Sequence, residues 1–158
     1  PATRTAQECY AHMFLNCTSL TTAPALPATS LVNEACYYDM FGGCTSLTAA
    51  PALPAKILTY NCYVQMFRGC TSLTTAPELP ATTLVYNCYA YMFEGCSNLN
   101  YLKCKATKYN ASAESYTECV DGWLSGVSPT GTFVGYRIDG ESPLKDHIPS
   151  TWTVEYLN

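Results

Sequence analysis

The fold is decided by the stretch Cys62-Tyr-Val-Gln-Met-Phe-Arg-Gly-Cys70, whose frame occurs four times in the chain. The copies begin at Cys9, Cys36, Cys62 and Cys88, so successive units are 27, 26 and 26 residues apart. In each copy, a cysteine, a methionine and a second cysteine are spaced four residues apart. A tyrosine follows the first cysteine and a phenylalanine follows the methionine, so these two are also four residues apart. Such an apolar stripe is typical of one face of an α-helix, and the glycine before the last cysteine suits a helix end. The frame therefore predicts one short helix per repeat.

The second half of each repeat predicts a short strand. In the unit at residues 54–79, the segment Thr71-Ser-Leu-Thr-Thr-Ala76 is rich in β-favouring residues and is followed by Pro77 and Pro80. Proline ends regular pairing and imposes extended geometry on the residue before it. Neither element can cover its own apolar side alone. We therefore expect an α/β leucine-rich-repeat solenoid, right-handed, with short parallel strands on its concave side and helices on its convex side.

The chain divides into four leucine-rich-repeat units at residues 1–99 and a non-repeating region at residues 100–158. One unit carries an extra residue between Leu31 and Cys36. The first unit begins at the repeat's own proline, Pro1, which we interpret as the trimmed end of a longer array. An array of repeats needs an atypical terminal unit to cover its last apolar face. We expect residues 100–158 to be that C-terminal cap, within the same domain.

The cap has its own predicted elements. Strict alternation of apolar and polar residues predicts a strand at residues 101–106, and two more strands are expected at 131–136 and 152–156. The loop between these last two carries Asp139-Gly140 and several charges. A capping box at residues 115–118 predicts a helix that continues through Leu124. Gly126 should end that helix.

Composition narrows the classes of partner. Charged residues make up 13% of the chain, the formal net charge is -4, and the eight lysines and arginines are scattered. This distribution gives no electrostatic footprint for nucleic acid or for an anionic membrane. No apolar run approaches the roughly 18 residues of a membrane span, and the N-terminal residues lack the apolar core of a signal peptide. We expect a monomer with no membrane span and no nucleic-acid partner.

The cysteines are predicted to be buried and reduced. Eight of the ten belong to the repeat frame, and the two in one helix would lie about 12 Å apart, beyond the reach of a disulfide. A pair between Cys104 and Cys119 stays open. No C-x-x-C motif or His/Cys cluster is present, so we expect no metal and no cofactor. The frame also predicts two buried ladders in the core, one of methionines and one of phenylalanines: Met13, Met40, Met66 and Met92, and Phe14, Phe41, Phe67 and Phe93.

No constellation of catalytic residues is evident, and we predict that the chain is not an enzyme. Its two histidines, His12 and His147, are expected to be solvated surface residues. Phosphate-loop, nucleophile-elbow and zinc-protease motifs are absent from the sequence. Glu78, Glu94 and Asp39 occupy non-equivalent positions in different repeats, which speaks against a pair of catalytic carboxylates.

Repeated polar and aromatic positions are the candidates for binding. Hydroxyl residues should form rows across the strands of the concave surface, and tyrosines should project from the convex side. Both sets have a plainer explanation, because threonine suits strands and tyrosine suits packing. The candidate binding residues are Ser46, Thr48, Ser72, Thr74, Tyr60 and Tyr86.

The frame Cys-Tyr-x-x-Met-Phe-x-Gly-Cys-Thr-Ser-Leu-Thr-x-Ala-Pro-x-Leu-Pro-Ala over residues 1–99 resembles the BspA-type leucine-rich-repeat surface proteins of Bacteroides-like bacteria. The C-terminal region is similar to the family's terminal element at residues 117–127, 131–133 and 148–154. The resemblance implies an exported protein, extracellular or on the bacterial cell surface, with no catalytic residues to carry over. It implies a module for adhesion to a host protein or glycan through the repeat surface. The alternative is a purely structural spacer or stalk segment of a larger surface protein.

Overall fold

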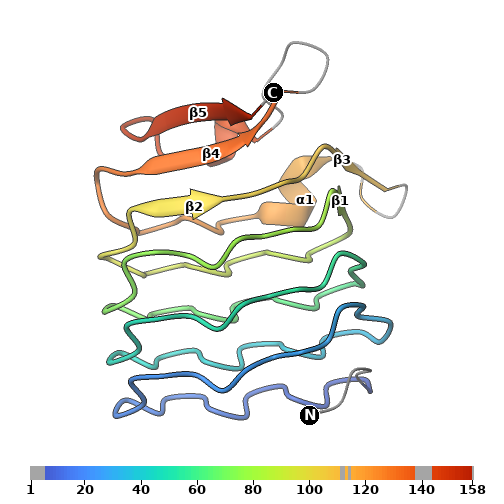
Figure 1. Cartoon of the computed structure of the whole chain (residues 1–158), viewed down its shortest axis with the longest axis vertical. Helices are drawn as coiled ribbons and strands as arrows, with labels where there is room; N and C mark the ends of the chain where they lie inside the picture. Colours follow the sequence, from blue (N-terminus) through green and yellow to red (C-terminus); the bar gives the residue numbers. More distant parts are fainter. Residues whose placement is uncertain (1–5, 111–112, 114, 138–143, 158) are drawn as a thin grey trace.

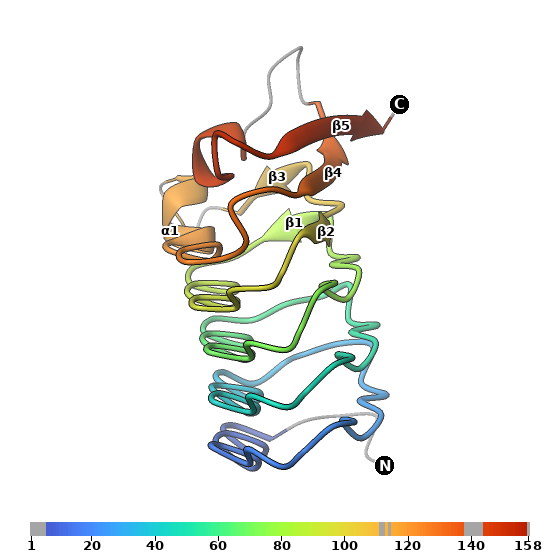
Figure 2. The same cartoon turned by 90° about the vertical axis from the view of Figure 1, so that its left-hand side faces the viewer.

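The computed structural model describes residues 6–110, 113, 115–137 and 144–157. In it, each repeat unit forms one layer, and the layers lie one above another in a straight stack (Figure 1). Viewed from the side, every layer has a tight coil along one edge and a more extended return path (Figure 2). The sequence frame forms the tight coil, which we call the turn segment. The four turn segments are residues 7–16, 34–43, 60–69 and 86–95.

The predicted leucine-rich-repeat solenoid of alternating helices and strands is wrong. Among the described residues, the single α-helix is α1, outside the repeats, and a short 3₁₀ helix, η1, lies near the C-terminus. Two small parallel sheets supply the named strands. Because the stack is straight in Figures 1 and 2, the predicted concave and convex sides are also absent. The elements are β1 (Thr83–Leu84), β2 (Tyr101–Lys103), β3 (Lys108–Tyr109), α1 (Tyr116–Val120), β4 (Thr132–Tyr136), η1 (Lys145–His147) and β5 (Thr153–Leu157).

A turn segment is a chain of tight turns in which every fourth residue has positive φ. In the third repeat these residues are Asn61, Gln65 and Gly69, with φ of 57°, 57° and 69°. L-residues with positive φ cannot continue a right-handed helix. The helix prediction failed because the period of the frame is four residues. An α-helix rotates residues four apart by about 40° relative to each other, whereas the turns keep them in line.

Backbone hydrogen bonds alternate along the turn segment. The N–H of Met66 donates within its own layer to the carbonyl of Tyr63, three residues back, at 3.2 Å. The next N–H, of Phe67, donates to the carbonyl of Met92 in the following layer at 2.9 Å. Each second donor is therefore satisfied by a turn and each intervening donor by a neighbouring layer. The four-residue coil therefore depends on hydrogen bonds to the layers above and below it. Helix propensity, which is a property of the local sequence, does not include these bonds.

Aromatic ladders fill the interior of the stack. Phe14, Phe41, Phe67 and Phe93 stack nearly parallel, with ring centroids 5.4, 5.6 and 5.7 Å apart. This confirms the phenylalanine ladder, although Phe14, in the first described layer, is only half-buried. The methionine ladder is confirmed for three members, which are buried: Met40, Met66 and Met92. It is wrong for Met13, which is 51% exposed in the first described layer. A second ladder, of stacked tyrosines, lies beside them: Tyr10, Tyr37, Tyr63 and Tyr89.

The extended half of each repeat pairs in parallel but rarely forms a strand. The predicted strand at residues 71–76 is reduced to one isolated bridge, between Thr75 and Tyr101. Further bridges join Thr22 to Ala49 and Ser30 to Ile57. The prolines keep these segments extended while interrupting their ladder of hydrogen bonds. The predicted strand segments are therefore correct in direction and wrong in extent.

The cap contains the longest strands. The predictions at residues 101–106, 131–136 and 152–156 correspond to β2, β4 and β5, which pair in parallel in that order. Their register aligns Leu102 with Phe133 and Phe133 with Val154. Asp139 and Gly140, placed by the sequence in the loop between the last two strands, lie outside the described residues.

The helix of the cap is shorter than predicted. Ser115 is its N-cap residue but makes no capping hydrogen bond through its side chain, and α1 ends at Val120. Beyond it the chain returns to the turn conformation, with positive φ at Gly122 and Gly126. The N–H of Phe93 donates to the carbonyl of Trp123 at 3.0 Å, so this segment covers the fourth repeat. No helix in the described part of the chain has the length and apolar character needed to cross a bilayer.

All ten cysteines are free thiols. Cys104 and Cys119, the pair left open by the sequence, are both buried and unbridged. Within the frame, the thiols of Cys70 and Cys96 donate to the carbonyls of Phe41 and Phe67 in the preceding layers, at 3.1 and 3.0 Å. Burial is complete for six of the eight frame cysteines, but Cys9 is half-buried and Cys17 is exposed because they belong to the first described layer.

Candidate functional site

The four predicted hydroxyl residues lie just after the turn segments, at equivalent positions in adjacent layers. Thr48 and Thr74 are exposed, whereas Ser46 and Ser72 are half-buried. The hydroxyl of Thr48 donates to the carbonyl of Thr21 at 3.4 Å, so part of its hydrogen-bonding capacity ties two layers together. The structure thus brings these residues into rows, of which the threonine row is the more accessible.

The two predicted tyrosines form a separate patch. Tyr60 and Tyr86 are 40% and 41% exposed and are the first residues of the turn segments of adjacent layers. The turn segment extends across the layer (Figure 1), which separates these tyrosines from the hydroxyl rows at its other end. The six candidate residues therefore belong to two surfaces.

The threonine row continues onto the outer face of the cap sheet, which the sequence did not single out. The N–H of Asn100 donates to the carbonyl of Thr74 at 2.9 Å, and the next residue, Tyr101, begins β2. Leu102 of β2 points inward and is buried, whereas Tyr101 and Lys103 face outward and are half-buried. The exposed Thr75, next to Thr74, pairs with Tyr101 in a parallel bridge, so the threonine row adjoins the outward face of β2.

Charged groups on this face are paired. The Nζ atoms of Lys103 and Lys105 lie 2.9 and 2.6 Å from the two carboxylate oxygens of Glu78. The hydrogen bonds from Lys105 and Lys103 lower the pKa of the Glu78 carboxyl group. The hydrogen bond to Glu78 raises the pKa of Lys103, and the nearby phenols of Tyr101 and Tyr136 act in the same direction. We call Glu78, Tyr101, Lys103, Lys105 and Tyr136 the sheet-face patch.

A shallow apolar cavity of about 420 Å³ adjoins Glu78. Prolines and small apolar residues line it: Ala50, Ala52, Leu53, Pro54, Pro77 and Pro80. The patch therefore combines two half-exposed aromatic rings, fixed charges and a hollow suited to an apolar group. One sequence signal was available, because Glu78 stands where the first two repeats have Ala25 and Ala52. Its partners could not be found without the register between layers.

A second polar cluster joins the first three layers. The side chain of Asp39 is only 6% exposed, and its Oδ2 atom lies 3.5 Å from His12 Nδ1 and 3.7 Å from Arg68 Nη2. Among the described residues, Oδ1 has no hydrogen-bond partner. It occupies the space beside Gly42, where an added Cβ atom would collide with it. This arrangement fixes three layers relative to one another.

Burial raises the pKa of Asp39, although Arg68 and His12 act to lower it. We expect Asp39→Asn to stabilise the protein at pH 7. A carboxyl group whose pKa is higher in the folded state than in the unfolded state opposes folding once it ionises, so stability falls as pH rises between the two values. Asparagine removes that cost and tolerates the positive φ of 48° found here.

Urea unfolding of both proteins at pH 7 and below the ordinary aspartate pKa of about 3.9 tests this. The gain from asparagine should shrink at the lower pH, because the native aspartate is then protonated in both states. Arg68→Gln is the matched control and should destabilise the protein more at pH 7 than at low pH. An equal gain at both pH values would contradict the assignment.

His12 is exposed, as predicted, whereas His147 differs from its predicted solvated state. The His12 side chain is 51% exposed but shares the Asp39 cluster. His147 is half-buried, its Nε2 atom lies 3.3 Å from Thr117 Oγ1, and its carbonyl accepts a hydrogen bond from Trp123 Nε1 at 2.7 Å. Among the described residues there is no group of three or more His, Cys, Asp or Glu side chains that could hold a metal ion.

Comparison with known proteins gave no relatives: no protein-family model, no curated protein and no solved structure matches this chain. The resemblance seen in the repeat frame therefore stays a prediction. A function for this chain rests on the geometry of its faces alone.

Proposed function

We propose that this chain is an interaction module of the cell surface or extracellular space that binds a protein or glycan and turns over no substrate. The observation that carries the proposal is the continuous face on which the threonine row meets the sheet-face patch and its apolar cavity. Tyrosine rings present a flat apolar surface with a polar tip, which suits both sugar rings and protein partners. Paired charges beside them supply oriented hydrogen-bonding groups at fixed positions.

The regular spacing of layers favours a ligand that is itself extended. Equivalent positions such as Thr48 and Thr74 recur in adjacent layers, so a polymeric ligand could contact several of them at once. Individually weak contacts then add through their high effective concentration. The second candidate, a structural spacer, is favoured by the straight stack, because stacked ladders of phenylalanine and tyrosine make a stiff rod.

A binding screen against immobilised glycans and matrix proteins, followed by variants of each face, tests the proposal. The double variant Thr48→Lys and Thr74→Lys and the single variant Tyr101→Ala should each weaken binding by about tenfold or more. The melting temperature should change little for the lysine variant, because both threonines are exposed. The matched control is Tyr60→Ser with Tyr86→Ser on the separate patch, which should leave affinity unchanged.

Two outcomes would count against this face. If binding is lost only in the Tyr60 and Tyr86 variant, the interaction uses the tyrosine patch. If a ligand binds equally to all variants, the repeats serve as a scaffold. In that case the cap becomes the better candidate for the binding site. Its described residues include Arg137, whose guanidinium lies 4.2 Å from the centroid of the Tyr156 ring. Failure to bind any member of the panel would favour the spacer.

A further inference from the structure

Every repeat layer has a donor face and an acceptor face. In the third layer, Asn61, Tyr63, Gln65, Phe67 and Gly69 all donate their N–H groups to carbonyls of the fourth layer. The intervening residues of the third layer accept N–H groups from the second layer through their carbonyls. The same five-bond pattern joins the first layer to the second, the second to the third, and the fourth to the cap. The turn segments therefore stack with one fixed polarity.

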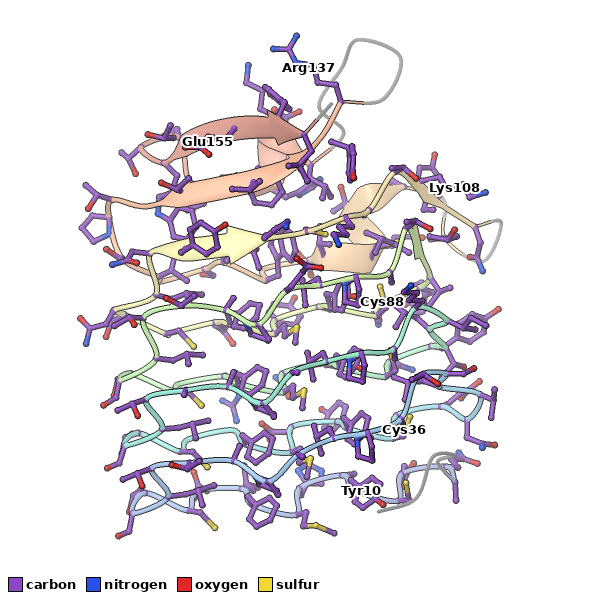
Figure 3. The ribbon with its side chains drawn as sticks, in the orientation of Figure 1. Tyr10, Cys36, Cys88, Lys108, Arg137 and Glu155 are labelled. Atoms are coloured by element: carbon purple, nitrogen blue, oxygen red, sulfur yellow. The ribbon has the colours of Figure 1, made fainter. Side chains whose placement is uncertain are left out.

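The acceptor face of the first layer lacks such a partner among the described residues. Its donor face is paired, because the N–H groups of Tyr10, His12 and Phe14 donate to the second layer at 2.9–3.0 Å. By contrast, the carbonyls on its other face accept no backbone N–H from any described residue: Cys9, Ala11, Met13 and Leu15. Tyr10 lies at this end of the stack in Figure 3. Among residues 6–110 and the described part of the cap, nothing therefore pairs with this row of acceptors.

Side chains on the same face are uncovered in a matching pattern. Met13 is 51% exposed, whereas Met40, its counterpart in the second layer, is 1% exposed. Cys17 is exposed, whereas Cys44 is buried. An apolar cavity of about 300 Å³ opens between the turn segment and the proline segment of this layer, lined by Tyr10, Phe14 and Leu26 among others. The ladders of the core therefore reach the surface here.

We propose that this face is a docking surface for a further repeat layer that carries the same Cys-Tyr-x-x-Met-Phe frame. Such a layer supplies N–H groups at alternate residues to the open carbonyls and continues the methionine, phenylalanine and tyrosine ladders. The interface already occurs three times between repeats in this chain, with ring centroids 5.4–5.8 Å apart. An apolar ligand without a row of donors would leave the carbonyls unsatisfied, at a cost in free energy.

A second copy of the described chain does not fit this surface. Two copies that meet through their first layers would bring acceptors against acceptors. The donor face at the other end of the repeats is already covered, because Tyr89 and Phe93 donate to Cys119 and Trp123 of the cap. The partner is therefore a separate layer of the same frame whose donor face is open.

Insertion of a copy of residues 54–79 ahead of Pro1 tests the proposal in the full chain. The junction repeats the natural sequence Glu-Leu-Pro-Ala-Thr found at residues 78–82. The readouts are the rate of alkylation of the native Cys17 thiol, followed by mass spectrometry, and the thermal melting temperature. In the matched control, the inserted counterparts of Tyr63, Met66 and Phe67 are replaced by serine.

The authentic insert should slow alkylation of Cys17 by about tenfold or more and raise the melting temperature, because the thiol becomes an internal member of its ladder. The control insert should change neither quantity. Equal alkylation rates with the authentic and the control inserts would overturn the proposal. So would strong protection of Cys17 in the chain without an insert, because the face would then already be covered.

Discussion

Replacement of Phe67 by alanine should lower the free energy of unfolding by about 3–5 kcal/mol, as truncation of buried aromatic side chains does. Phe67 is fully buried, and its ring lies between those of Phe41 and Phe93, with centroids 5.6 and 5.7 Å away. Its backbone N–H and carbonyl belong to the hydrogen bonds that join layers. The backbone cannot collapse into the space left by the ring without breaking those bonds, so the cavity persists.

Urea denaturation of the purified chain measures this loss. Met13→Ala is the control, because that side chain belongs to the neighbouring methionine position of the frame but is 51% exposed. We expect it to cost less than about 1 kcal/mol, as substitutions at exposed positions do. A loss below about 1 kcal/mol for Phe67→Ala would show that the ladder is not a packed core.

Gly69→Val should destabilise the chain by about 2–3 kcal/mol, since a β-branched residue is poorly tolerated at positive φ. The φ of Gly69 is 69°, and a Cβ atom there would lie 3.8 Å from the nearest atom, the Cα of Gly43. Space is therefore available, and the cost comes from the backbone conformation. Gly69→Ala is the smaller companion change and should cost about 1–2 kcal/mol.

The substitution Gln65→Gly should change the free energy of unfolding in opposite directions for a turn segment and for a helix. In a helix, glycine in the interior would cost about 1 kcal/mol. In the turn segment, Gln65 has a φ of 57°, so glycine relieves strain and stability should stay unchanged or rise. The same denaturation experiment decides the sign. A clear loss of stability for Gln65→Gly, together with a small effect of Gly69→Val, would return the frame to the helical interpretation.

The periodicity of the frame was enough to predict the layers' contents but not their conformation. The fully buried Phe67 and Met66 follow from an apolar stripe in either conformation. A period of four residues and a period of 3.6 residues place apolar side chains at nearly the same positions over a stretch of only nine residues, so the sequence does not distinguish them. Positive φ would have been the better signal, but His12, Asp39, Gln65 and Tyr91 occupy one set of these positions, with φ of 57°, 48°, 57° and 54°. None of these four residues indicates a positive φ in the sequence as clearly as glycine does.

The cap strands were easier to predict because their period of two residues is local. Alternation at residues 101–106 shows which side chains face inward, and β2 confirms it for Leu102. The threonine row followed from the repeat spacing. The sheet-face patch could not be predicted in this way. Glu78 contacts Lys103 only because two segments 25 residues apart pair in one particular register. The local sequence of these proline-containing segments does not specify that register.

The single polarity of the bonds between turn segments has an electrostatic consequence. Peptide dipoles aligned in one direction sum to a macrodipole in an α-helix, and half of the peptide groups in each turn segment are aligned in this way along the stack. Their N–H groups point toward the cap and their carbonyls toward the first layer, so the positive pole lies at the C-terminal end of the repeats, the reverse of an α-helix. Acidic residues Glu118 and Asp121 stand in the layer that receives these donors. The first layer is the negative pole and favours cationic groups beside it.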